Sequence, residues 1–143
     1  MFSWFTKRKL RKATTKDISY FDLCGQKLYA RICDVYDGDS CTLIIKTCGR
    51  LYRVKCRLMG IDTAELRSKD PLEKEHAIKA RSYMDQYLNK VVWAIFFEND
   101  KYGRSLVSLH KDNVCINDAL IKEKLAYAYD GQGKKPFNVW FSG

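Results

Sequence analysis

Three short polar stretches combine acidic and basic side chains of the kinds that cleave phosphodiester bonds. They are residues 36–40 (YDGDS), 57–65 (RLMGIDTAE) and 100–104 (DKYGR). Metal-assisted cleavage needs a hard cation on the phosphate oxygens, a base that activates water, and fixed positive donors for the charge that develops in the transition state. All three requirements are met by residue types within these stretches.

Five side chains supply the groups. Asp39, Asp62 and Glu65 carry carboxylate oxygens, the donors that hard divalent cations prefer. Arg57 and Arg104 carry guanidinium forks that match phosphate geometry and keep their charge. Together they predict a metal-dependent phosphodiesterase.

Each stretch also has an ordinary structural explanation. Residues 37–39 are typical of a hairpin turn, 62–65 of a polar loop and 100–103 of a second turn. The two arginines could be surface residues of strands. The combination of all three stretches in one chain favours the chemical interpretation.

The elements that must position these stretches follow from the residue pattern. We predict strands at residues 27–36, 41–46, 51–58, 91–97 and 105–110, so that each stretch begins where a strand ends. A helix should begin at Asp70, with Pro71 in its first position and Glu73 completing a capping box. Asn117 can cap a second helix.

Apolar residues at helical spacing predict which helix faces meet the core. In the first helix they are Ala77, Ala80, Met84, Tyr87 and Leu88. In the second they are Ala119, Leu120, Ile121 and Leu125. Residues 59–69 are expected to form a loop, and residues 127–143 suggest no particular element.

Three strands, a helix, two strands and a helix is the order of an oligonucleotide-binding (OB) fold. We therefore predict an α+β, mainly β protein: a five-stranded OB-fold barrel with two to three helices. Other α+β domains share this order. The barrel domain should span residues 26–143, after a flexible basic arm at residues 1–25.

Charge and composition bound the function. The 143 residues suffice for one domain, and the net charge of +9 favours polyanionic partners such as nucleic acid. Residues 7–12 hold five of the basic side chains and show no clear periodicity, so a solvated, disordered arm is expected there. Nuclear targeting or a non-specific hold on phosphates are the alternatives.

No apolar run is long enough to span a membrane, so no membrane association is expected. The first apolar residues precede the basic ones, the reverse of a secretory signal, which predicts an intracellular protein. Six cysteines include no C-x-x-C pair. Cys33, Cys41 and Cys56 fall in apolar strands and are expected to be reduced core residues.

Taken together, the three stretches resemble the staphylococcal-nuclease (thermonuclease) family. In that family D-G-D-[ST], R-x-x-x-x-D-T-x-E and D-x-Y-G-R occur in this order at comparable spacing, and the resemblance covers about residues 27–125. The short chain, its V-Y-D-G-D opening and residues 129–131 (YDG) also resemble single-domain members encoded by large DNA viruses.

The resemblance implies a Ca²⁺ site made by the carboxylates of Asp39 and Asp62 and the carbonyl of Thr63. Asp37 would orient that site from behind. Glu65 would orient and deprotonate the attacking water. The implied activity is an endonuclease that cuts DNA and RNA with little sequence preference and leaves 3′-phosphates.

The resemblance also implies substrate contacts. Arg57 and Arg104 would clamp the phosphate, and Lys101 and Tyr102 would contact a neighbouring one. Tyr127 or Tyr129 could stack on a base, or one of the two could be a core residue.

One departure from the family pattern is Ala64, which replaces the proline usual before the catalytic glutamate and should loosen that loop. The main alternative function is a non-catalytic OB-fold module that binds nucleic acid or protein, recognisable by loss of the arginines or the glutamate. A metal-binding structural domain without a nucleic-acid role is a second. We expect a monomer.

Overall fold

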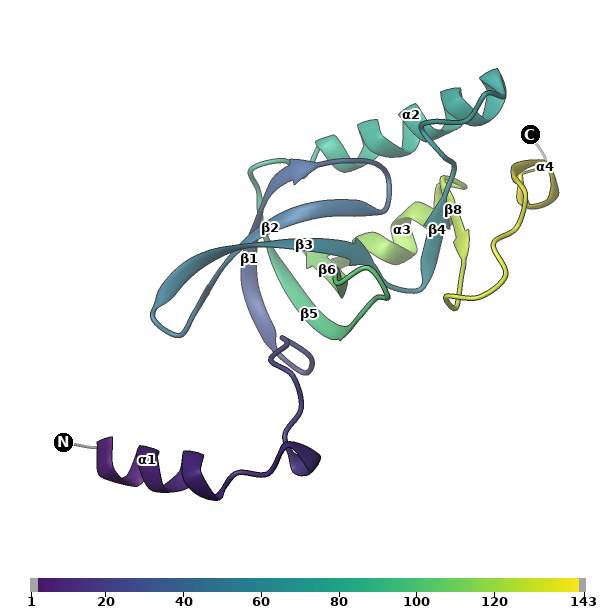
Figure 1. Ribbon diagram of the computed structural model, residues 1–143. Helices are drawn as coiled ribbons and strands as arrows, with labels where there is room; N and C mark the ends of the chain where they lie inside the picture. The colour runs from purple at the N-terminus through teal and green to yellow at the C-terminus, as the bar shows by residue number, and fades with distance from the viewer. Residues whose placement is uncertain (1–2, 142–143) are drawn as a thin grey trace.

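A closed barrel of five long strands forms the body of the protein. The computed structural model describes residues 3–141. The strands are β1 (Lys27–Val35), β2 (Ser40–Thr47), β3 (Arg50–Leu58), β5 (Val91–Asn99) and β6 (Ser105–Lys111). They pair in the order β3-β2-β1-β5-β6, and a parallel pairing of β3 with β6 closes the ring (Figure 1). The predicted α+β, mainly β barrel is confirmed.

Short strands and helices complete the fold. Two short strands, β4 (Ile61–Thr63) and β8 (Ala126–Ala128), pair beside the barrel, and β7 (Val114–Cys115) pairs with β6. The helices in the described part of the chain are α1 (Ser3–Lys12), α2 (Pro71–Asp85), α3 (Ile116–Lys122), α4 (Phe137–Trp140) and a short 3-10 turn at Thr15–Asp17.

The core follows the alternation of apolar residues along the strands. Ile32, Leu43, Leu58, Phe96 and Leu109 are almost completely buried inside the barrel. Inward residues alternate with exposed ones because successive side chains of a strand point to opposite faces. The apolar residues fill the inside of the barrel, and polar residues at the strand ends lie at its rim.

The five predicted strands and both predicted helices are present, but the described residues also contain elements that the sequence did not suggest, and their four α-helices exceed the two to three expected. The expected loop at residues 59–69 contains β4, and the unassigned tail contains β8 and α4. These strands have only three residues each, too few to show a period of two. In α2, Leu88 was expected in the core but is exposed, because the helix ends at Asp85.

The capping box predicted for α2 forms only in part. The Asp70 carboxylate accepts a hydrogen bond from the Leu72 amide at 3.0 Å, as a cap does. Glu73, however, accepts from the Ser68 hydroxyl at 2.6 Å and from the Glu65 amide at 3.4 Å, not from Asp70. Glu73 therefore ties down the segment that carries Glu65.

Asn117 does not cap α3, which begins one residue earlier. Its buried amide instead accepts from the Leu109 amide at 3.1 Å and donates to the carbonyls of Met59 and Val107 at 2.9 and 3.0 Å. Three backbone groups that would otherwise be buried without partners are satisfied by one side chain. Asn117 thus joins α3 to β6 and to the end of β3.

The basic arm is helical over Ser3–Lys12, where an irregular segment was expected. Lysine, arginine and leucine are good helix formers, which accounts for the difference. None of the described side chains of α1 is buried. No helix among the described residues is long and apolar enough to cross a membrane.

All six cysteines are free thiols, but of the three predicted to be core residues Cys33 is only partly buried. Cys41 and Cys56 are buried, and burial raises the pKa of the Cys41 thiol to about 12. Burial also raises the pKa of Cys56. Both behave as small apolar core residues.

Gly38 allows the turn before β2 to approach its neighbours closely. The φ angle of Gly38 does not lie in the left-handed region, so the backbone conformation of the turn does not itself require glycine. An added Cβ would lie 2.6 Å from the Cβ of Ala80 and 3.1 Å from Cγ2 of Thr63. Contact with α2 and β4 therefore requires glycine here.

We expect Gly38→Ala to lower the free energy of unfolding by about 1–3 kcal/mol through this overlap. Ala80→Gly should cost about 1 kcal/mol alone because glycine disfavours a helix. The double variant should be more stable than the sum of the two losses predicts, since Ala80→Gly removes the clashing methyl group. Urea unfolding of the four proteins measures this, and strictly additive losses would contradict the close approach.

Candidate active site

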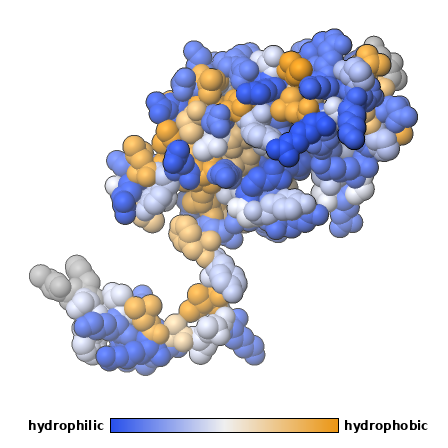
Figure 2. Space-filling view, turned by 45° about the horizontal axis from the view of Figure 1, so that its top comes forward, coloured by the Kyte–Doolittle hydropathy of each residue, from blue (hydrophilic) through white to orange (hydrophobic). Residues whose placement is uncertain are grey.

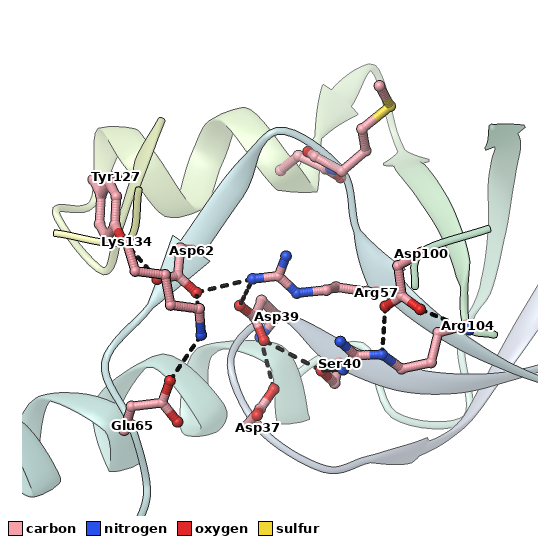
Figure 3. A network of polar contacts seen from close by, with 12 residues as sticks. Asp37, Asp39, Ser40, Arg57, Asp62, Glu65, Asp100, Arg104, Tyr127 and Lys134 are labelled. Carbon is pink, nitrogen blue, oxygen red and sulfur yellow. Dashed lines mark hydrogen bonds and ion pairs between the residues drawn. The ribbon is translucent and has the colours of Figure 1, made fainter. Parts of the chain in front are cut away.

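Arg57 lies between two buried carboxylates at the rim of the barrel. Its Nη2 donates to Oδ2 of Asp39 at 3.1 Å and to Oδ1 of Asp62 at 2.9 Å (Figure 3). The three side chains are nearly buried, with 12%, 8% and 6% of their area exposed for Arg57, Asp39 and Asp62. Two segments that are distant in the sequence therefore meet on one guanidinium.

Strand pairing places these residues. Ser40 pairs with Arg57 between β2 and β3, which brings the turn carrying Asp39 beside the arginine. Asp62 lies in the middle of β4 and pairs with Tyr127 of β8. Without β8, the segment carrying Asp62 would have no partner strand to hold it.

Arg104 extends the network from the third stretch. Its Nε donates to Oδ2 of Asp100 at 2.7 Å, and its Nη1 donates to the Ser40 hydroxyl at 3.3 Å. Ser40 in turn donates to Oδ1 of Asp39 at 3.2 Å. The arginine is thereby linked to the same carboxylate that Arg57 contacts.

Asp100 organises the turn that presents Arg104. Its Oδ1 accepts from the amides of Tyr102 and Arg104, both at 2.9 Å. Burial opposes ionisation of Asp100, but the hydrogen bonds from Arg104 and Tyr102 outweigh it and lower its pKa. Asp100 is therefore an ionised anchor for Arg104, a role that the sequence did not reveal.

Glu65 is exposed and pairs with a residue that the sequence did not single out. Lys134 Nζ donates to Oε1 of Glu65 at 3.0 Å and lies 3.7 Å from Oδ1 of Asp62. The pair of lysines at 134–135 in the unassigned tail was the only signal for it. Figure 3 shows Lys134 reaching between the two acids.

The two candidate base-stacking tyrosines differ. Tyr127 is buried, and its hydroxyl donates to Oδ2 of Asp62 at 2.7 Å while accepting from the Lys135 amide at 2.9 Å. Burial, aided by the bond to Asp62, raises the pKa of Tyr127 to about 12. Tyr127 is therefore the core residue of the two tyrosines, and the prediction that it stacks on a base is wrong.

Tyr129 and Tyr102 remain available at the rim. Tyr129 is half-buried, with its ring centre 5.5 Å from the Arg57 guanidinium carbon. Tyr102 is largely exposed, and the Lys101 ammonium and Arg104 guanidinium lie 5.2 and 5.7 Å from its ring centre. An aromatic and cationic border thus surrounds the two arginines.

Asp39 is held in an unfavourable environment for its charge. Burial, followed by the charge of Asp37, raises its pKa to about 6 in spite of the neighbouring Arg57. Asp37 also accepts from the Asp39 amide at 3.1 Å. The carboxylates at this rim therefore favour a nearby positive charge.

The donor set fits a hard divalent cation. Asp39 and Asp62 both touch one nitrogen, so their oxygens are close enough for a single ion to bridge, and buried Thr63 follows Asp62 directly. Within residues 3–141, no three His, Cys, Asp or Glu side chains gather around one point. The two carboxylates would leave several coordination positions open.

A hollow adjoins these acids. A cavity of about 360 Å³ is lined by Asp62, Thr63 and Glu65 on one side and by residues of the tail, including Lys134 and Trp140, on the other. Six of the predicted charged residues thus lie in one connected network (Figure 3), namely Asp37, Asp39, Arg57, Asp62, Glu65 and Arg104, whereas Lys101, among the described residues, contacts only the Tyr102 ring beside it.

A family comparison decides the relationship of the chain. The model of the staphylococcal nuclease homologue family matches residues 55–138. The chain belongs to this family. The match includes Arg57, Asp62, Glu65 and Arg104, and the Arg57 contact adds Asp39, which precedes the matched range.

A relative from the plant Capnoides sempervirens is described only as an uncharacterized 38.1 kDa protein. It is 31% identical over 87 residues, which are 61% of this chain and 24% of that protein. The chain thus spans about a quarter of the length of this relative. The family match covers two of the three segments that build the site, those that carry Arg57 to Glu65 and Arg104.

The raised pKa of Asp39 predicts a pH-dependent stability change. A carboxyl with a higher pKa in the folded state stabilises the fold below pH 3.8, and this contribution is lost as the pH rises through about 6. In EGTA, Asp39→Asn should therefore raise the free energy of unfolding by about 1–3 kcal/mol at pH 8. Below pH 4 the gain should vanish.

Denaturant titrations at pH 4 and pH 8 measure the difference. Asp85→Asn, at the exposed end of α2, provides a matched control that should change little at either pH. A loss of stability at pH 8 for Asp39→Asn would show that the pair with Arg57 outweighs the cost of burial.

Proposed function

We propose that the protein is a Ca²⁺-dependent phosphodiesterase that hydrolyses internal bonds of DNA or RNA with little sequence preference and leaves 3′-phosphates. Family membership supports a nuclease, and the convergence of Arg57 with Asp39 and Asp62 supports an intact site. This contact brings cationic and acidic groups from separate segments to one rim.

The carboxylates of Asp39 and Asp62, with the Thr63 carbonyl, would hold the cation. When bound, Ca²⁺ would offset the charge of the substrate phosphate and polarise its oxygens. Asp37 restrains the backbone of Asp39 through its amide and so keeps the turn in place. Tyr127 does the same for Asp62 through its hydroxyl.

The arginines would stabilise the negative charge that develops on the phosphate. Arg104 is held through Nε by Asp100, which leaves its terminal nitrogens directed toward Ser40 and the site. Arg57 is held by two carboxylates through a single nitrogen and retains other donors. Donors fixed before the reaction lower its barrier without reorganisation.

Glu65 would orient water and accept its proton. It is exposed beside the cavity, and Lys134 holds it near Asp62. Ala64, which replaces the usual proline, is buried against Ala77 and Phe137. Packing of Ala64 and the Glu73 bond to the Glu65 amide would thus provide the restraint expected of a proline.

Tyr102, Lys101 and Tyr129 would contact the substrate beyond the reacting phosphate. Exposed aromatic rings stack on bases regardless of sequence, and cations beside them follow the backbone. Such contacts suit a nuclease with little preference between sequences. The net charge of +9 would add attraction over longer distances.

A non-catalytic nucleic-acid-binding module is the second candidate, and one observation favours it. The three acids proposed to act directly are paired internally, Asp39 and Asp62 with Arg57 and Glu65 with Lys134. Binding of single-stranded DNA without any cleavage in Ca²⁺ would support this candidate and refute the enzyme.

We expect Glu65→Gln to lower kcat by about 10²–10⁴-fold, since general acid–base groups contribute on this scale. Its melting temperature should stay close to that of the wild type because Glu65 is exposed. Digestion of a fluorescent oligonucleotide measures the rate. Glu75→Gln, on the exposed face of α2, is the control and should remain active; equal rates for both variants would contradict the role of Glu65.

Excess EGTA should abolish cleavage of plasmid DNA and RNA, and added Ca²⁺ should restore it, because without the cation nothing would polarise the substrate phosphate beside Asp39 and Asp62. Calorimetric titration with Ca²⁺ should show binding that Asp62→Asn removes. Cleavage that continues undiminished in EGTA would contradict the metal requirement.

A further inference from the structure

The helix α1 is strongly cationic and stands away from the barrel. Among its ten residues are Lys7, Arg8, Lys9, Arg11 and Lys12, and none is acidic. Figures 1 and 2 both show α1 apart from the barrel, and none of its described residues is buried. A helix with this charge is attracted to anionic surfaces.

The same helix exposes large apolar side chains. Trp4, Phe5 and Leu10 are 61%, 62% and 70% exposed. The rings of Trp4 and Phe5 contact each other edge to face, and the Arg8 guanidinium lies 5.7 Å from the Trp4 ring centre. Apolar and cationic side chains thus alternate around one exposed helix, and Figure 2 shows orange among blue in the segment outside the barrel.

Exposed apolar residues continue between α1 and the barrel. Ile18 and Phe21 are largely exposed, and Tyr20 is almost completely so. A linker that only contacts solvent has no need of large apolar side chains. Exposed apolar clusters normally mark an interaction surface. Like the apolar residues of α1, these side chains are left largely exposed by the barrel.

Although the sequence led us to expect no membrane association, we propose that α1 and residues 18–21 bind the surface of an anionic lipid bilayer. Trp4 and Phe5, whose rings touch, would enter the boundary between headgroups and acyl chains, while the basic residues contact lipid phosphates. Ten residues are too short to cross a bilayer, so α1 lies along its plane. This surface is separate from the network around Arg57 and does not depend on the proposed nuclease activity.

Aliphatic residues favour a bilayer over nucleic acid as the partner. Both carry phosphates that attract lysine and arginine. Ile18, however, has no aromatic face to stack on a base, whereas it gains directly from burial among acyl chains. Charge and apolar exposure occur in one segment, as in helices that lie on membranes.

The first test uses the full chain and sedimentation with vesicles of phosphatidylcholine, with or without about 30% phosphatidylserine. The protein should bind only the anionic vesicles, and less at high salt. We expect W4S/F5S to weaken binding by about tenfold or more, because two aromatic side chains no longer enter the bilayer. The matched control L51S/L72S changes residues that are 70% and 68% exposed elsewhere and should bind normally.

The second test removes charge. Changing all five basic residues of α1 to glutamine should weaken vesicle binding by about a hundredfold or more. The control removes five exposed lysines elsewhere, namely Lys27, Lys46, Lys69, Lys74 and Lys122. Circular dichroism melts of both variants verify that the barrel is folded.

Brominated lipids locate the helix directly. They should quench part of the tryptophan emission in the wild type but much less in W4F, which retains Trp93 and Trp140. Wild-type protein that ignores anionic vesicles would overturn the proposal. So would an α1 glutamine variant that keeps vesicle binding but loses affinity for a single-stranded oligonucleotide, which would identify α1 as a hold on nucleic acid.

Discussion

The pairing of Arg57 with Asp39 and Asp62 is the interaction on which the arrangement of the rim depends. All three side chains are largely buried, and a buried charge without a partner is strongly destabilising. One nitrogen of Arg57 compensates two carboxylates that arrive from opposite sides of the arginine in the sequence. Without this charge, repulsion would drive the turn before β2 away from β4.

The same arrangement gathers more carboxylates than cationic side chains around Asp39. Asp37 adds a third carboxylate near Asp39, and burial with this neighbour raises the pKa of Asp39. A rim that stabilises positive charge so strongly is suited to guanidinium and to a divalent cation alike. Clustering these carboxylates destabilises the fold, and the same clustering would favour binding of the proposed cation.

The tail after β8 completes the site from outside the barrel. Its Lys135 amide bonds the Tyr127 hydroxyl, which bonds Asp62, and Lys134 reaches Glu65. An aromatic cluster anchors α4, where His76 of α2 lies within 5.5 Å of the rings of Phe137, Trp140 and Phe141, measured between ring centres. Burial lowers the pKa of His76, which keeps it neutral in this apolar setting.

Local signals in the sequence determined the strands, α2 and the charged residues of the rim. Alternating apolar residues, the Asp70–Pro71 helix start and the three polar stretches depend on neighbours within a few positions, and they predicted a barrel with acids and arginines at its strand ends. The family pattern added the spacing between those stretches. Each of these signals depends only on residues that are close together in the sequence.

Only the tertiary structure decided which groups meet across long separations. Tyr127 is a core residue because β8 pairs with β4, Asn117 joins backbone segments instead of capping a helix, and Lys134 reaches Glu65 from a tail without pattern. Strands of three residues and contacts of single side chains produce no repeating pattern in the sequence from which they could be predicted. Their partners lie up to 69 residues away, so only the folded chain, with β8 and the tail packed beside the barrel, brings them together.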